Sequence, residues 1–206
     1  MRHRLTLLLA VLVLGLQAQE RNWKVETSKD GSVVVKSDIV NDADIDGKKG
    51  KVIHYIVEKT GGATLVQMEQ FLRDSKNYKN IWENTKESKE LKRITNNEWI
   101  SYLFFKTPWP MANNDCVHRM YFESKGENGF SLKGKAEPNA YAKKKADRLT
   151  YYDMEFKVTK VGAGRTKLTL TVSYGLTSDV PKFLLKGWFP KGPIGIINRV
   201  FEHAVK

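Results

Sequence analysis

Apolar and polar residues alternate along much of the chain, a period of two that is typical of β-strands with one buried and one exposed face. Alternation on both sides of Lys29-Asp30-Gly31 predicts a hairpin within residues 23–39, and residues 51–58 form a third alternating stretch. After residue 82 the chain keeps strand spacing almost to Gly175, interrupted by turns rich in glycine, proline and asparagine. The pattern therefore predicts a long antiparallel meander.

The alternation separates the side chains of this meander onto two faces. One face is apolar and contains Cys116, His118, Met120, Phe122, Phe130, Leu132, Ala136, Tyr152, Met154, Phe156, Val158, Leu168, Leu170, Val172 and Tyr174. The other face is polar and contains Asp115, Arg119, Glu123, Lys133, Lys135, Asp153, Glu155, Lys157, Lys167, Thr169 and Thr171. An antiparallel sheet with one solvated face follows. Asp115 and Arg119 fall on the same face, where we expect a structural ion pair rather than a general acid/base pair.

Helical spacing occurs in two regions. Thr64 and Gln67 have the spacing of a capping box and precede an apolar series at helical period, and a second short helix is predicted around Tyr78, Ile81 and Trp82. From Pro181 the period is helical again, with an interruption at residues 190–193. Beyond it lies one apolar stripe: Ile194, Ile197, Val200, Phe201 and Ala204. A one-sided helix after an antiparallel sheet is expected to cover the apolar face of that sheet.

The first residues have the three-part pattern of a secretory signal peptide. A basic start, Met1-Arg2-His3-Arg4, is followed by an uncharged apolar run at 5–16 and then by polar residues, with Ala18 small enough for a cleavage site. The run is shorter than the roughly 18 residues of a spanning helix, so an uncleaved anchor is the lesser alternative. We expect a signal peptide at 1–18, a single domain at 19–206, and a periplasmic or secreted product.

The charge balance indicates which partners to expect. Among 206 residues, 35 lysines and arginines against 23 acidic residues leave a formal net charge of +12, which favours transient contact with anionic membrane surfaces. The densest basic run, the three lysines at 143–145, lacks the interleaved aromatics of a nucleic-acid platform, so no nucleic acid is expected. Cys116 is the sole cysteine, which excludes an intrachain disulfide and favours a small buried side chain over a reactive thiol. We expect a monomer.

One segment carries a more specific signal. Residues 108–115, Pro-Trp-Pro-Met-Ala-Asn-Asn-Asp, closely resemble the P-W-P-x-x-N-R-D signature of the StAR-related lipid-transfer (START) family. Three other parts of the family pattern have counterparts in Trp23-Lys24-Val25 with Asp30-Gly31, in Asp74 with Trp82, and in Val180-Pro181. Two departures are Asn114, which stands where the family has arginine, and residues 177–179, which are shorter than the family's Asp-Pro-x-Gly segment.

The resemblance covers residues 23–205 and implies an α+β helix-grip fold. In that fold a strongly curved antiparallel β-sheet wraps around a long C-terminal α-helix, with two short helices after the third strand. This is the same order of elements that the periodicity predicts. Because of Asn114, the buried charge interaction that the family's arginine makes is not carried over to this chain.

Motifs for catalysis and metal binding are missing from the sequence, which has no Gly-x-Ser-x-Gly elbow, no phosphate loop and no metal-binding His/Cys spacing. We expect no catalytic residue, no metal and no cofactor. Among four dispersed histidines, His118 alone falls on the apolar face of the meander. It is either a hydrogen-bonded core histidine or a contact to the polar group of a ligand.

The fold that the resemblance implies encloses a cavity, and apolar walls favour an apolar ligand, whose burial yields on the order of 25 cal/mol per Å². The predicted function is therefore non-catalytic binding and transport of a lipid or other hydrophobic small molecule. The expected lining residues are His118, Met120, Phe122, Phe130, Leu132, Tyr152, Met154, Phe156, Leu170, Val172, Trp188, Ile197, Val200 and Phe201. Trp188 and its neighbour Phe189 are either core or part of the cavity mouth.

Two other classes of function stay open. A cyclase-like or hydrolytic enzyme on the same fold would hold an aromatic or polyketide substrate, with His118 and Tyr152 as acid/base candidates. A protein-interaction module would have a filled core.

For ligand entry we expect a hinge at residues 190–193 and a lid at 194–205. Lys186 and Lys191 would then lie near anionic head groups. A sheet loop within 126–142 is the alternative gate.

Overall fold

The computed structural model describes residues 21–107, 112–177 and 180–206. The predicted signal peptide at 1–18, residues 108–111 of the START-like signature, and residues 178–179 lie outside these ranges. Within the described part of the chain, no helix is both long enough and apolar enough to cross a membrane.

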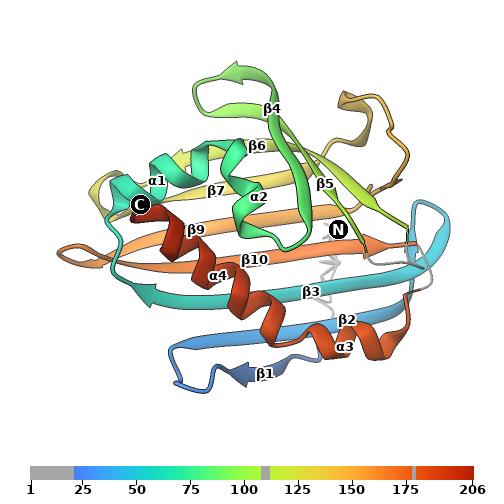
Figure 1. Ribbon diagram of the computed structural model, residues 1–206, viewed down its shortest axis with the longest axis horizontal. Helices are drawn as coiled ribbons and strands as arrows, with labels where there is room; N and C mark the ends of the chain where they lie inside the picture. The colour runs from blue at the N-terminus through green and yellow to red at the C-terminus, as the bar shows by residue number, and fades with distance from the viewer. Residues whose placement is uncertain (1–20, 108–111, 178–179) are drawn as a thin grey trace, which may run out of the picture.

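The sheet is ten-stranded and almost entirely antiparallel (Figure 1). Its strands are β1 (Lys24–Thr27), β2 (Val33–Ile45), β3 (Lys48–Gly61), β4 (Thr85–Thr95), β5 (Glu98–Phe105), β6 (Asn114–Ser124), β7 (Gly129–Ala136), β8 (Asp147–Arg148), β9 (Tyr152–Gly162) and β10 (Arg165–Leu176). Their order in space is β1-β2-β3-β10-β9-β7-β6-β5-β4, and β8 pairs in parallel with β6. The predicted hairpin and meander are confirmed.

Pairing of β3 with β10 joins strands that are far apart in the sequence. The register places Val172 opposite Tyr55 and Tyr174 opposite Ile53, while on the other side of β10 Tyr174 lies opposite Tyr152 of β9. Side chains with this parity face the concave side of the sheet, and the pairing therefore gathers three tyrosines in one region of that side.

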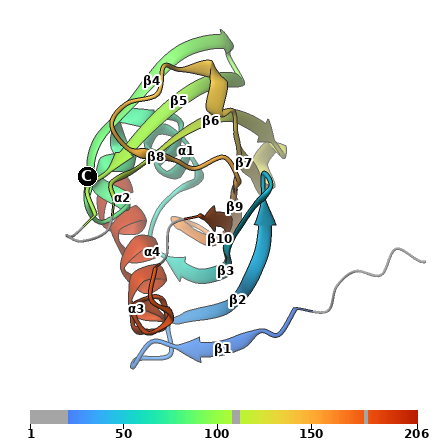
Figure 2. The ribbon, with the colours of Figure 1, turned by 90° about the vertical axis from the view of Figure 1, so that its right-hand side faces the viewer.

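The helices pack on the concave side of the sheet (Figure 2). They are α1 (Leu65–Arg73), α2 (Tyr78–Ile81), α3 (Lys182–Trp188) and α4 (Lys191–Ala204), with short 3₁₀ turns at η1 (Ser75–Asn77), η2 (Gly126–Asn128) and η3 (Pro138–Ala140). The capping box at the start of α1 is confirmed: the Gln67 backbone N–H donates to the Thr64 hydroxyl, and the Thr64 N–H donates to the Gln67 side chain. The predicted helix-grip class is confirmed.

The C-terminal helical region is divided into two helices, as the predicted interruption indicated. α3 ends at Trp188 and α4 begins at Lys191, because Pro190 has no N–H to continue the helix. Gly192 and Pro193 lie in the first turn of α4, where proline is tolerated. The predicted interruption at 190–193 is therefore narrower than expected. The apolar face of α4, which includes Ile197 and Val200, is buried against the sheet.

One predicted surface pair is wrong. Asp115 is fully buried, because the segment containing η3 and β8 covers the outer face of β6 at this point. Its carboxylate accepts hydrogen bonds from Arg148 at 2.5 and 2.9 Å and from the Tyr102 hydroxyl at 3.2 Å. Arg119 instead forms half-exposed ion pairs with Glu98 and Glu137. Parity identified the face, but it could not show that another segment covers it.

Replacing Arg148 tests the importance of this buried pair. Arg148→Met would leave the Asp115 carboxylate buried without a counter-charge, and we expect a loss of about 3–5 kcal/mol in the free energy of unfolding. Arg119→Met, at a half-exposed pair, should cost less than about 1 kcal/mol. Urea denaturation followed by circular dichroism measures both. Equal losses for the two variants would contradict the structural importance of the Arg148–Asp115 pair.

Candidate ligand-binding cavity

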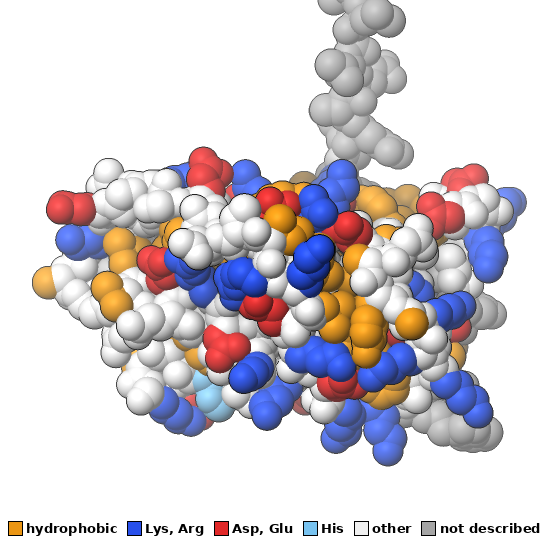
Figure 3. Space-filling model, turned by 90° about the horizontal axis from the view of Figure 1, so that it is seen from above, with side chains coloured by type: hydrophobic (Ala, Val, Ile, Leu, Met, Phe, Trp, Pro, Cys, Tyr) orange, Lys and Arg blue, Asp and Glu red, His pale blue; other side chains and the backbone are white. Residues whose placement is uncertain are grey.

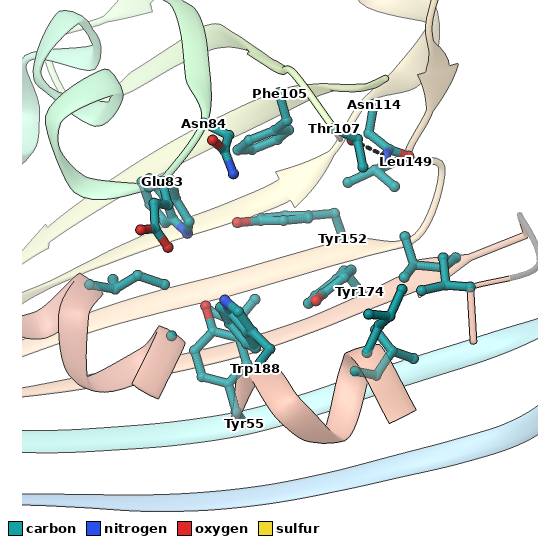
Figure 4. A pocket seen from close by; sticks show the side chains of 18 of the residues that line it. Tyr55, Glu83, Asn84, Phe105, Thr107, Asn114, Leu149, Tyr152, Tyr174 and Trp188 are labelled. Atoms are coloured by element: carbon teal, nitrogen blue, oxygen red, sulfur yellow. Dashed lines mark hydrogen bonds between the residues drawn. The ribbon is translucent and has the colours of Figure 1, made fainter. Parts of the chain in front are cut away.

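A partly enclosed cavity of about 320 Å³ lies between the concave face of the sheet and α2, α3 and α4 (Figure 4). The sheet contributes Tyr55, Phe105, Asn114, Tyr152, Val172, Tyr174 and Leu176. The helices and loops contribute Trp82, Glu83, Asn84, Thr107, Ala112, Leu149, Val180, Leu184, Leu185, Trp188, Gly192, Ile196 and Arg199. Most of these side chains are aliphatic or aromatic, as in small-molecule sites generally.

Three tyrosines bring hydroxyl groups into this apolar space. Tyr55, Tyr152 and Tyr174 come from the adjacent strands β3, β9 and β10 and point into the cavity (Figure 4). Burial raises the pKa of each of these phenols well above its usual value, so all three are uncharged at any physiological pH. The cavity interior therefore offers hydrogen bonding without charge.

Charged side chains lie at the edge of the cavity. Glu83 is exposed, and Arg199 is partly exposed and donates from Nε to the backbone oxygen of Ile81 at 2.7 Å. On another side, Asn114 donates to the Thr107 hydroxyl at 3.3 Å, and the Thr107 N–H donates to Asn113. These two asparagines of the START-like signature thus hold the chain beside the cavity in place.

Trp188 connects α3 to both the sheet and α4. Its indole packs edge-on against Tyr55, with ring centroids 5.6 Å apart, and Phe189 makes a similar contact with Tyr55 at 6.1 Å. The indole also lies directly over Gly192, so that a Cβ at this position would come within 1.9 Å of the ring. Trp188 lines the cavity, whereas Phe189 is buried core.

Three of the fourteen expected lining residues, Tyr152, Val172 and Trp188, line this cavity. The other predicted residues lie elsewhere: His118, Met120, Phe122, Phe130, Leu132, Met154, Phe156, Leu170, Ile197, Val200 and Phe201. Apart from His118, they belong to the packed hydrophobic cluster beneath α1, α2 and α4. Their side chains pack between the helices and the sheet, and the cavity lies beside this cluster, next to α3, the start of α4 and the end of α2.

His118 is buried beside the cavity rather than in its wall. Its ring lies 4.6 Å from the Tyr152 ring between centroids, and Nδ1 is 3.4 Å from the Ser101 hydroxyl, which is a long hydrogen bond. Within the described residues Nε2 has no hydrogen-bond partner. Burial lowers the pKa of His118 to about 3, so the ring is neutral and supports Tyr152 by packing.

Sequence reasoning missed several lining residues. Tyr55 has the same parity as Ile53 on a predicted strand, and this signal could have placed it on the concave face. Leu149 precedes β9, and Leu184 and Leu185 lie in α3, so no strand alternation identifies them.

Among the described residues, no group of three His, Cys, Asp or Glu side chains is arranged to hold a metal ion. Burial raises the pKa of Cys116, which disfavours its reactive thiolate.

No protein-family model matches the sequence, and no curated protein is significantly similar to it. Solved structures are similar in fold. A STAR-related lipid transfer protein from Xanthomonas axonopodis (fragment 25–204) is 19% identical with a TM-score of 0.72, over 89% of this chain and 99% of that one. Human STARD10 is 15% identical with a TM-score of 0.71, over 89% and 73%.

A third similar structure, the ZhuI aromatase/cyclase from a Streptomyces species, is 14% identical with a TM-score of 0.55, over 75% of this chain and 94% of that one. At these identities the similarity establishes the fold. The chain has the helix-grip fold of START domains.

Gly192 is predicted to determine the position of Trp188 and hence the shape of the cavity mouth. Gly192→Ala would force the indole off α4, and we expect a shifted tryptophan emission maximum and a loss of about 1–3 kcal/mol in the free energy of unfolding. Gly187→Ala, in α3 with open space around its Cβ, is the matched control and should be neutral or slightly stabilising. Indistinguishable emission spectra for the two variants would rule out this role.

Proposed function

We propose that the protein is a non-catalytic carrier that binds a lipid or other apolar small molecule in this cavity. The observation that carries the proposal is the apolar and aromatic cavity between the concave sheet face and α3 and α4. The similar structure from Xanthomonas axonopodis is described as a lipid transfer protein, which supports a lipid or other apolar molecule as the ligand. Lipid transport between membranes is the specific activity proposed.

A cyclase-like or hydrolytic enzyme is the second candidate, because the aromatase/cyclase neighbour has the same fold and Tyr152 lines the cavity. General acid/base catalysis works best with a pKa near the working pH. The cavity tyrosines have raised pKa values and His118 has a lowered one, so none of these groups has a pKa near neutral pH. These shifts favour the carrier.

The carrier proposal predicts a bound ligand in natively purified protein comprising residues 19–206. Organic extraction and mass spectrometry should recover an apolar molecule near one per chain, or a fluorescent fatty acid or sterol should bind. Leu184→Trp, at the cavity mouth, should reduce binding at least several-fold, whereas Val161→Trp, exposed in the strand β9 away from the cavity, should not. Protein that yields no ligand and binds none of these probes would refute the carrier.

For loading we propose contact between α3 and an anionic membrane. Phe183 is 71% exposed and Leu184 43% exposed, and Lys186 and Lys191 are exposed close by in the chain. Basic side chains beside apolar ones favour anionic lipid surfaces. Elsewhere, as on the face in Figure 3, basic side chains are distributed among acidic ones. Because Leu184 also lines the cavity, docking here would bring the cavity mouth to the lipid.

Vesicle sedimentation tests this contact. Wild-type protein should sediment with phosphatidylglycerol vesicles, and binding should weaken with salt. Phe183→Ser should lower the bound fraction several-fold, whereas Val161→Ser, which removes an apolar side chain of similar exposure on another part of the surface, should not. Equal binding by the two variants would exclude α3 as the contact.

We also propose that the protein is exported and acts as a monomer. The apolar run at 5–16 supports export, and its cleavage after Ala18 would be visible as the mature N-terminus of protein recovered from the periplasm or medium. The lid at 194–205 and the alternative gate within 126–142 stay predictions.

A further inference from the structure

Two tyrosine rings lie side by side in the wall of the cavity. Tyr152 of β9 and Tyr174 of β10 are directly opposite in the register, with ring centroids 6.2 Å apart and rings inclined by 34°. Both rings extend into the cavity; the Tyr174 hydroxyl points toward the side where Trp188 lies, and the Tyr152 hydroxyl points toward the side where Glu83 lies (Figure 4). Tyr152 is held in place from behind by the His118 ring at 4.6 Å. The pair is therefore a fixed feature of the cavity wall.

Neither hydroxyl has a strong protein partner. The Tyr152 hydroxyl is 3.8 Å from the sulfur of Met154, a weak acceptor. Among the described residues, the Tyr174 hydroxyl makes no hydrogen bond. Tyrosine hydroxyls in buried positions normally find a partner. Each of these hydroxyls is therefore able to donate a hydrogen bond to an oxygen of a bound molecule.

The charge of the cavity restricts the ligand further. The tyrosine hydroxyls are neutral donors, and among the described residues the lining includes one cation, Arg199 at the edge, where Nε already donates to Ile81. An ionised carboxylate beside Tyr152 and Tyr174 would lose hydration without gaining a counter-charge. A carbonyl or hydroxyl oxygen loses much less on burial and can bond to the same donors.

The size of the cavity limits the apolar part. About 320 Å³ is near the lower end of the roughly 300–1,000 Å³ range of ligand sites. Trp82, Leu149 and Val172 line this space and leave its walls flat and apolar beside the tyrosine pair. A compact ring system or a single short chain fits such a volume, and a phospholipid with two acyl chains does not.

We propose that the ligand is an uncharged, compact apolar molecule with a carbonyl or hydroxyl oxygen, and that this oxygen accepts a hydrogen bond from the hydroxyl of Tyr152 or of Tyr174. The inference rests on the proposed ligand-binding function of the cavity and names the ligand class. It also assigns to the tyrosine pair the polar recognition that the sequence had suggested for His118.

Three probes with one ring skeleton test the proposal: fluorene, 9-fluorenone and fluorene-9-carboxylate. Binding to the wild-type protein is measured by quenching of tryptophan fluorescence, since Trp82 and Trp188 line the cavity. A hydrogen bond from a tyrosine hydroxyl to the carbonyl should make 9-fluorenone bind about fivefold tighter than fluorene. The carboxylate should bind more weakly than 9-fluorenone.

Substitutions identify the groups responsible. Tyr152→Phe or Tyr174→Phe should reduce the preference for 9-fluorenone over fluorene, and the double variant should abolish it. Tyr121→Phe, 40% exposed on the outer face of β6, is the control and should keep the wild-type preference. Thermal unfolding of every variant shows whether it is folded, and the ratio of the two affinities measured on the same protein is independent of small stability changes.

The outcomes separate the inference from the proposed function. Equal binding of fluorene and 9-fluorenone, or a preference that survives in the double variant, overturns the tyrosine assignment while leaving an apolar carrier. Tightest binding of the carboxylate overturns the uncharged class. If none of the three probes binds but the protein carries a larger lipid, the compact class is overturned and the carrier stands; if nothing binds at all, both fail.

Discussion

Burial of the concave face is the constraint on which the rest of the structure depends. The strands from β3 to β6 present a continuous set of apolar side chains on this side, and leaving them in water would be strongly unfavourable. Near the C-terminal end of α4 the contact is close, since Phe201 lies so near Gly61 that any Cβ there would collide with its ring. Toward α3 and the start of α4 the side chains do not fill all of the space above the sheet, and the cavity is what is left.

The tertiary structure explains why the sequence predicted the sheet well and the site poorly. Alternation correctly placed Phe156 and Tyr152 on the same face, because parity depends only on local strand geometry. Phe156 is nevertheless core and Tyr152 lines the cavity, because where the helices fill the concave face depends on non-local packing. The break at Pro190, by contrast, could be predicted because proline acts through its own backbone.

Next to Asn114, the buried Asp115 carboxylate has its counter-charge in another part of the chain. The resemblance led to doubt about the buried charge interaction, since arginine is missing at that position. The structure supplies Arg148 from the short strand β8, whose guanidinium reaches Asp115 and three backbone oxygens, those of Pro138, Tyr141 and Ala142. The positive charge thus comes from a distant segment. The motif alone does not reveal this distant partner, although a buried carboxylate requires one.

The sheet is open, so it has two edge strands, and unpaired backbone groups along an edge can template pairing with another chain. At one edge, β1 is only four residues long. At the other, β4 carries alternating lysine and glutamate residues and its register with β5 shifts at three points. Shortness, charge and irregularity each disfavour edge-to-edge aggregation. A protein with a large apolar concave face is at risk of such aggregation while it folds, and its two edges are built to limit that risk.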